Sequence, residues 1–136
     1  MDERLQYPSF SGIMTFLRSP YIKVDEANQG DYVVIGAPYD TTTGSRPGSR
    51  YAPNSIRTET VHFLYHLTAI DKEVMDVVTK QRMTCNMIGT IKDAGDVRVY
   101  LSDVSKTSDS ISDGVASITS AGATPVVLCQ VFGQDF

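Results

Sequence analysis

Three aspartates stand where an α/β sheet would place its ligand-binding loops. Asp40 follows a run of β-branched residues, and Asp93 and Asp96 follow a second apolar segment. Ligands of open α/β sheets bind outside the carboxyl ends of the strands, where carboxylates can hold a metal ion or a cationic substrate. The alternative is that these aspartates accept hydrogen bonds from loop amides and cap helices. We favour the alternative because Asp is a common turn residue.

Three arginines, Arg46, Arg50 and Arg57, are spread over the stretch that follows Asp40. They could pair with the nearby carboxylates or contact a neighbouring subunit. Arginine does not lose its proton in proteins, so it cannot serve as a general base. We therefore predict structural ion pairing for these arginines in preference to catalysis.

His62 and His66 lie four residues apart, which would place two imidazoles on one side of a helix. The zinc-protease version of this spacing needs Glu directly after the first histidine, where this chain has Phe63, and no third ligand is visible. We expect partly exposed helix histidines rather than a metal site. Cys85 and Cys129 lack an obvious base partner and are predicted to be buried structural thiols. A thiol nucleophile paired with either histidine is the alternative.

The strands that must position these residues are indicated by apolar or β-branched runs. Three strands are predicted, over residues 31–36, 86–92 and 124–128. The second strand is expected to end in a turn at 93–97. Residues 37–52 form a long loop rich in Gly, Pro, Thr, Ser and Arg, and long ordered loops often carry function.

Helical spacing of apolar residues predicts a helix after each of the first two strands. The first begins at Pro53, a residue tolerated in the first turn, and its apolar face is formed by Ile56, Thr60, Phe63, Leu64 and Leu67. The second is capped by Ser108 or Asp109, ends before Gly122, and buries Ile111, Val115 and Ile118. Residues 68–85 are predicted to form a short helix with a loop. The alternation of strand and helix predicts an α/β fold with parallel strands and right-handed crossovers.

Composition limits the possible partners and setting of the chain. Its 136 residues suit one domain, and 12 basic against 16 acidic side chains give a net charge of −4. Nucleic acids and anionic membranes need clustered cationic side chains, so we expect neither as a partner. No apolar run reaches the length of a membrane span, and the first ten residues do not resemble a secretory signal. Two cysteines form no disulfide framework, so a cytoplasmic setting is expected.

Five segments carry a family resemblance. They are a leader at 10–21, Gly-Ala-Pro-Tyr-Asp at 36–40, Arg-Pro-Gly-Ser-Arg at 46–50, Asp-Ala-Gly-Asp-Val at 93–97 and the strand approach at 121–128. Together they resemble the ureohydrolase (arginase/agmatinase) family, and most closely its agmatinase-like branch. The resemblance implies a three-layer αβα fold with a mostly parallel sheet, of which this chain has the first three strands.

The resemblance also implies a reaction. Family members hold two divalent ions, usually manganese and sometimes nickel, and hydrolyse a guanidino compound to urea and an amine. The parent enzymes are homo-oligomers, with the leader wrapped onto neighbouring subunits. In this family the motif Gly-Gly-Asp-His-Ser follows the third strand and brings the first metal ligand. This chain has Cys129 to Phe136 there, and the later Asp-x-His-x-Asp motif is missing.

Because this chain lacks those metal-ligand motifs, we expect it to differ from the family's complete enzymes. Residues 1–30 are expected to form an amino-terminal extension and 31–136 a partial ureohydrolase domain, with a divergent tail at 129–136. We expect a truncated amino-terminal fragment that binds no manganese and does not catalyse. Its residues for the substrate pocket or for loop organisation are Asp40, Arg46, Arg50, Asp93 and Asp96, and none of them is assigned to catalysis or metal binding. The alternatives are association with full-length ureohydrolase subunits, or a small module that binds a guanidinium or amine.

Overall fold

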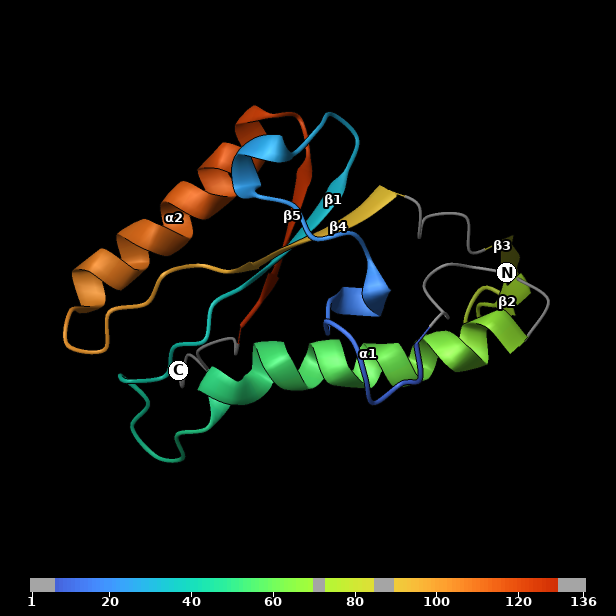
Figure 1. The fold of residues 1–136 in the computed structure, drawn as a ribbon, viewed down its shortest axis with the longest axis horizontal. Helices are drawn as coiled ribbons and strands as arrows, with labels where there is room; N and C mark the ends of the chain where they lie inside the picture. The colour runs from blue at the N-terminus through green and yellow to red at the C-terminus, as the bar shows by residue number, and fades with distance from the viewer. Residues whose placement is uncertain (1–6, 70–72, 85–89, 130–136) are drawn as a thin grey trace.

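A computed structural model describes residues 7–69, 73–84 and 90–129 (Figure 1). Its main sheet has three parallel strands in the order β4-β1-β5, which are Ile91–Asp96, Tyr32–Gly36 and Thr124–Leu128. Two long helices connect them, α1 at Ala52–Ala69 and α2 at Val104–Ser120. The α/β class and the parallel sheet predicted from the sequence are confirmed. Across the described residues, each helix is too short or too polar to cross a lipid bilayer.

The central strand β1 separates two packed layers. Successive side chains of a strand point to opposite faces, and Ile35 and Gly36 show which helix covers each face. The Ile35 side chain lies against Gly114 of α2, whereas Gly36 lies against Pro53 of α1. Val33 and Ile35 pack with Ile118 of α2 in one apolar core. The two helices therefore cover opposite faces of the sheet.

The two edges of this sheet are finished differently. The chain at Pro20–Ile22 runs along the outer edge of β4, where the Asp93 N–H donates to the Pro20 C=O and the Ile22 N–H donates to the Asp93 C=O, each at 3.0 Å. On the other side, no strand within the described residues pairs with the outer edge of β5. One edge of the sheet is thus covered by the leader, and the other lacks a described partner.

Both helices differ from their predicted outlines. Helix α2 begins at Val104, earlier than predicted, because Asp103 is its N-cap and accepts a hydrogen bond from the Lys106 N–H at 3.0 Å. The predicted start of α2 came from the spacing of its apolar residues. The first turn of α2 lies outside that pattern because its buried residue is the polar Thr107. On α1 the buried face is Pro53, Arg57, Val61 and Leu64, and Phe63 is exposed.

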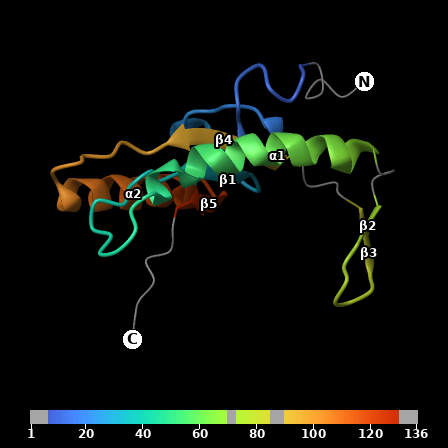
Figure 2. The same cartoon turned by 90° about the horizontal axis from the view of Figure 1, so that it is seen from below.

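Two further predictions were wrong. Residues 68–85 were predicted to contain a short helix, but α1 continues to Ala69 and is followed by an antiparallel hairpin of β2, Glu73–Met75, and β3, Arg82–Thr84. Figure 2 shows this hairpin extending away from the sheet beyond the end of α1. The second strand lies at Ile91–Asp96 instead of 86–92 (residues 85–89 are outside the described part). Its Asp-Ala-Gly-Asp sequence suits a turn, but here it is paired as a strand.

Candidate functional site

Asp40 lies at the end of the segment that leaves β1 and organises the loop after it. Its side chain is buried, and Oδ2 accepts hydrogen bonds from the Gly48 N–H at 2.6 Å and the Arg50 N–H at 3.2 Å. Oδ1 accepts a third from Arg50 Nε at 2.5 Å. Burial alone would raise the pKa of Asp40, but the two backbone donors and the Arg50 guanidinium outweigh it and hold the pKa below its ordinary value. Asp40 is therefore an ionised group that closes the loop onto itself.

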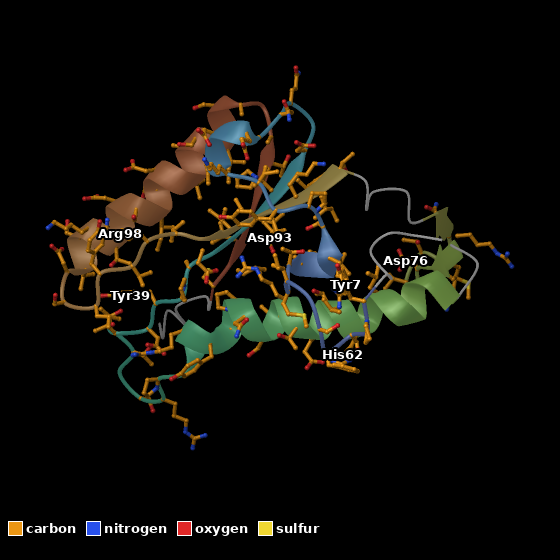
Figure 3. The ribbon with its side chains drawn as sticks, viewed as in Figure 1. Tyr7, Tyr39, His62, Asp76, Asp93 and Arg98 are labelled. Atoms are coloured by element: carbon orange, nitrogen blue, oxygen red, sulfur yellow. The ribbon has the colours of Figure 1, made fainter. Side chains whose placement is uncertain are left out.

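A second cluster lies between β4 and α1, around Asp93 (Figure 3). Asp93 is fully buried, and its carboxylate accepts hydrogen bonds from Arg57 Nε at 2.8 Å and Arg57 Nη2 at 3.0 Å. The backbone N–H groups of Phe16 and Gly95 donate to the same carboxylate, at 2.7 and 2.8 Å. Both carboxylate oxygens thus carry two hydrogen bonds each. This satisfies the requirement that a buried charge be paired and hydrogen-bonded.

Arg57 joins Asp93 to the end of the strand. Its Nη1 donates to Asp96 Oδ1 at 2.6 Å, and its Nη2 also donates to the Gly95 C=O at 2.8 Å. Burial alone would lower the pKa of Arg57, but the bonds and charges of Asp93 and Asp96 raise it above its ordinary value, so the guanidinium stays charged. Asp96 itself is about two-fifths exposed. It is the member of this cluster that faces solvent.

A β-bulge explains how two aspartates three residues apart reach one arginine. In a regular strand such residues would point to opposite faces. Here Val34 pairs with Asp93 and Gly36 pairs with Asp96, so β4 carries one extra residue against β1. Gly95 lies at the bulge with φ +72°, a conformation that favours glycine. The extra residue turns both carboxylates to the α1 face of the sheet.

Gly36 completes this arrangement because it leaves space for Asp96. A Cβ atom at Gly36 would overlap Asp96 Oδ1 and would lie 2.8 Å from Pro53 Cβ. The Gly36 C=O also accepts a hydrogen bond from the Val97 N–H at 2.9 Å. The glycine at the end of β1 is therefore required for the close approach of β4 and α1.

The geometry separates the predicted site residues into two groups. Asp40 and Arg50 form one, Asp93 and Asp96 share Arg57 in the other, and Arg46 is exposed on the loop between Asp40 and Arg50. The structure thus shows Arg50 and Arg57 paired with carboxylates. Whether these residues contact a substrate stays a prediction.

Comparisons with known proteins agree with this arrangement. The arginase family model matches residues 30–129. This chain belongs to the arginase family. It is 34% identical over 117 residues to proclavaminate amidinohydrolase of Streptomyces clavuligerus, a match that covers 85% of this chain and 33% of the relative. It is 28% identical over 118 residues to mitochondrial agmatinase of Gallus gallus, covering 86% of this chain and 31% of the relative.

A solved structure supports the same fold. The crystal structure of a hypothetical agmatinase from Burkholderia thailandensis superposes with a TM-score of 0.65 at 20% identity, and the match covers 88% of this chain and 34% of that chain. The α/β fold is therefore the fold of an arginase-family protein. The chain spans about a third of the length of the curated relatives it matches.

The arginase family generally depends on manganese, so the described residues can be tested as ligands. Within 7–69, 73–84 and 90–129, no three His, Cys, Asp or Glu side chains lie together as an ion centre would need. In the buried carboxylates of Asp40 and Asp93, both oxygens already accept hydrogen bonds from N–H groups, and Asp96 is paired with Arg57. This donor set does not fit a manganese centre.

The remaining reactive residues of this arginase-family chain are exposed or undescribed. His62 is exposed on α1 (Figure 3), and the side chain of His66 lies outside the described residues, as does Cys85. Cys129 is exposed, so the prediction of a buried thiol was wrong for it. The reason is its place, one residue beyond Leu128, where the chain leaves an edge strand that lacks a second described neighbour.

Sequence reasoning gave Arg57 less weight than the structure does. Arg57 makes four hydrogen bonds and links α1 to both aspartates of β4. A signal was present, since Arg57 is spaced four residues from both Pro53 and Val61, which share its buried face. A charge on an otherwise apolar helical face indicates a buried partner. Thr60 was placed on the apolar face of this helix, but its spacing did not indicate that it accepts a hydrogen bond from the Leu17 N–H.

Proposed function

We propose that this chain is the amino-terminal part of an agmatinase-like ureohydrolase, an enzyme that hydrolyses a C–N bond of a guanidino compound and releases urea and an amine. The family match over residues 30–129 carries the proposal. Its proposed organisation is an extension at 1–30 and a partial catalytic domain at 31–136, with a divergent tail at 129–136. The relatives named above as an agmatinase and an amidinohydrolase support a guanidino substrate.

The described residues support a scaffolding role within that enzyme. Asp40 with Arg50 closes the loop after β1, and Arg57 with Asp93 and Asp96 fixes the end of β4. Both clusters lie at the carboxyl ends of parallel strands, where ligands of such sheets bind. We propose that these ion pairs hold the rim of the substrate pocket, and that the chain by itself neither binds the two manganese ions of the parent enzyme nor turns over substrate.

The experiment measures urea release and bound metal on the purified chain. The protein is incubated with manganese and with agmatine or a guanidino acid, then dialysed for elemental analysis. We expect no urea above a blank and substoichiometric manganese. Urea release with stoichiometric manganese would overturn the proposal that this chain is inactive, while leaving its family membership intact.

A second candidate function is cytoplasmic association of this chain with longer ureohydrolase subunits, which in the parent family form homo-oligomers. The observations that favour it are the exposed Phe10 and Ile13 of the leader, each 82% exposed, and the outer edge of β5. Co-expression with a tagged full-length relative, followed by affinity capture and sizing, tests it. Binding of a free amine by Asp40 and Asp96 is less favoured, because both carboxylates already pair with arginines.

A further inference from the structure

The leader segment at 7–22, called the strap below, is held on the molecule by polar contacts to α1 and β4. The Phe16 N–H donates to Asp93 Oδ2 at 2.7 Å, and the Leu17 N–H donates to Thr60 Oγ1 at 3.1 Å. Backbone bonds to Asp93 then continue the strap along the outer edge of β4, as described above. The strap therefore meets both α1 and β4 through specific hydrogen bonds.

Apolar anchoring of the strap is confined to its second half. Leu17 is 9% exposed and lies in the turn that packs beside α1, and the half-buried Ile22 packs against the apolar core described above. Phe10 and Ile13 are each 82% exposed, and Tyr21 is 62% exposed. Burial of apolar surface is the main favourable term in packing a segment, and the hydrogen bonds of Phe16 and Leu17 supplement the anchoring that Leu17 and Ile22 provide.

The attached strap also carries unfavourable features. Leu17 and Arg18 are consecutive residues in the left-handed region, with φ 51° and 50°, a conformation that L side chains rarely adopt. Arg18 Nε and Ser19 Oγ are buried without a hydrogen-bond partner. Release would relax the two backbone angles and return both polar atoms to water.

We propose that the strap is a releasable clasp, and that its latch is the Asp93 carboxylate together with the Thr60 hydroxyl. Arg57 acts through Asp93, because its two hydrogen bonds orient the carboxylate toward the Phe16 N–H. Release of the latch frees the outer edge of β4, where the Asp93 N–H and C=O would become available to another strand. The clasp is independent of catalysis and of the proposed ureohydrolase activity.

Limited digestion with trypsin tests the clasp through the Arg18–Ser19 peptide bond. Proteases require an extended, accessible segment, whereas this bond has Arg18 left-handed and Ser19 buried. Cleavage at Arg18 thus follows the population of released strap when opening is fast. The Lys106–Thr107 bond in the first turn of α2, where Thr107 is buried, reports opening at a site outside the strap. Both rates are measured in one digest by mass spectrometry.

The diagnostic variant is Thr60→Val, and the matched control is Thr58→Val on the same helix. Both threonine hydroxyls donate to a backbone C=O of α1, that of Arg57 for Thr60 and that of Asn54 for Thr58, but Thr60 also accepts from the strap. Thr60→Val leaves the Leu17 N–H unpaired, so we expect cleavage at Arg18 to rise about tenfold over the control. Cleavage at Lys106 should stay equal in the two variants.

A second variant addresses the other half of the latch. Asp93→Asn removes the charge that Arg57 and the Phe16 N–H share, and we expect the ratio of Arg18 to Lys106 cleavage to rise here as well. Equal Arg18 rates in Thr60→Val and Thr58→Val would overturn the clasp. So would a rise that appears at Arg18 and Lys106 in the same proportion, because the opening would then not be specific to the strap.

Discussion

Single residues decide the direction of the carboxylates in β4. Asp93 and Asp96 reach the same guanidinium because the bulge at Gly95 gives β4 one extra residue opposite the Val34–Gly36 stretch of β1. The Asp-x-Gly-Asp spacing is therefore the sequence form of a bulge that brings two acids to one face. The sequence alone suggested a turn at this position, since Asp and Gly favour turns as well as bulges.

Replacement of the bulge glycine should be costly. Gly95→Ala places a Cβ on a residue with φ +72° and at 3.2 Å from Tyr21 Cε2. We expect the free energy of unfolding to fall by about 1–3 kcal/mol, as for other strained backbone positions. Gly30→Ala is the control, because Gly30 has φ +86° with open space around it. Urea denaturation should show a larger loss for Gly95→Ala, and equal losses would mean that the bulge contributes nothing beyond its backbone angle.

Asp40 should contribute to the pH dependence of stability. Its pKa is held below the ordinary value of about 4 in the folded chain, so the unfolded state binds the proton more readily. The stabilisation is complete above the unfolded pKa and is lost as pH falls through the lowered, folded pKa. We expect the stability gap between wild type and Asp40→Asn to be constant near neutrality and to shrink on acidification. Urea denaturation over a pH series checks this, and a gap that widens in acid would contradict it.

At the scale of elements, α1 and β4 are joined by one buried ion pair. The guanidinium of Arg57 and the carboxylate of Asp93 are each almost wholly buried, whereas Arg50 is two-fifths exposed beside Asp40. Removing one member of a buried pair leaves an uncompensated charge. Arg57 on α1 therefore matters more for the fold than Arg50 in the loop.

Arg57→Met should destabilise the domain strongly. We expect a loss of about 3–5 kcal/mol of unfolding free energy, the usual result of breaking a buried pair. Arg50→Met, at the more exposed pair, should cost less because solvent screens it. Adding Asp93→Leu to Arg57→Met should recover part of the loss, because the stranded charge is then gone. Denaturant midpoints of the three variants decide this, and a mild Arg57→Met would argue against the buried pair as the main link.

Local sequence patterns were enough to predict strands β1 and β5 and the start of α1. The two strands are continuous apolar runs, and Pro53 is a residue that a helix tolerates in its first turn. The hairpin at Glu73–Thr84 could not, since its turn depends on Asp76 accepting hydrogen bonds from the Val78 N–H and the Thr79 hydroxyl. The aspartates of the candidate site were found by position in the sheet. Their partners depended on register and on the bulge, which no local pattern specifies.

At the scale of the whole molecule, the sheet has one covered edge and one without a described partner. The Thr124 N–H and the Leu128 C=O bond toward β1, so the alternate residues Pro125 and Val127 turn their backbone groups to the outer edge of β5. Pro125 has no N–H, which leaves Val127 as the outward donor within this strand. An incoming strand would therefore find two carbonyls and one N–H in β5.

This edge should make the isolated chain prone to association. Exposed apolar edge strands pair with other chains, and a charged side chain on the edge suppresses this. We expect wild type to bind a hydrophobic dye and to form higher-order species by light scattering, and Val126→Lys to reduce both. Val77→Lys in the hairpin turn is the control, because Val77 is exposed away from this edge. A wild-type chain that stays monomeric at high concentration would contradict the prediction.

The central place of β1 has a consequence for the order in which the chain can fold as it is synthesised. Tyr32 leaves the ribosome early, yet its partners are Ile91 on one side and Thr124 on the other. Neither flanking strand can pair with β1 until the long connection before it has been synthesised. Pairing must then offset the entropy lost on closing that connection. The buried strand with the strongest β pattern therefore stays exposed and apolar until Ile91, and on its other side Thr124, has been synthesised. Its protection during that interval falls to chaperones or to transient collapse with the nascent α1.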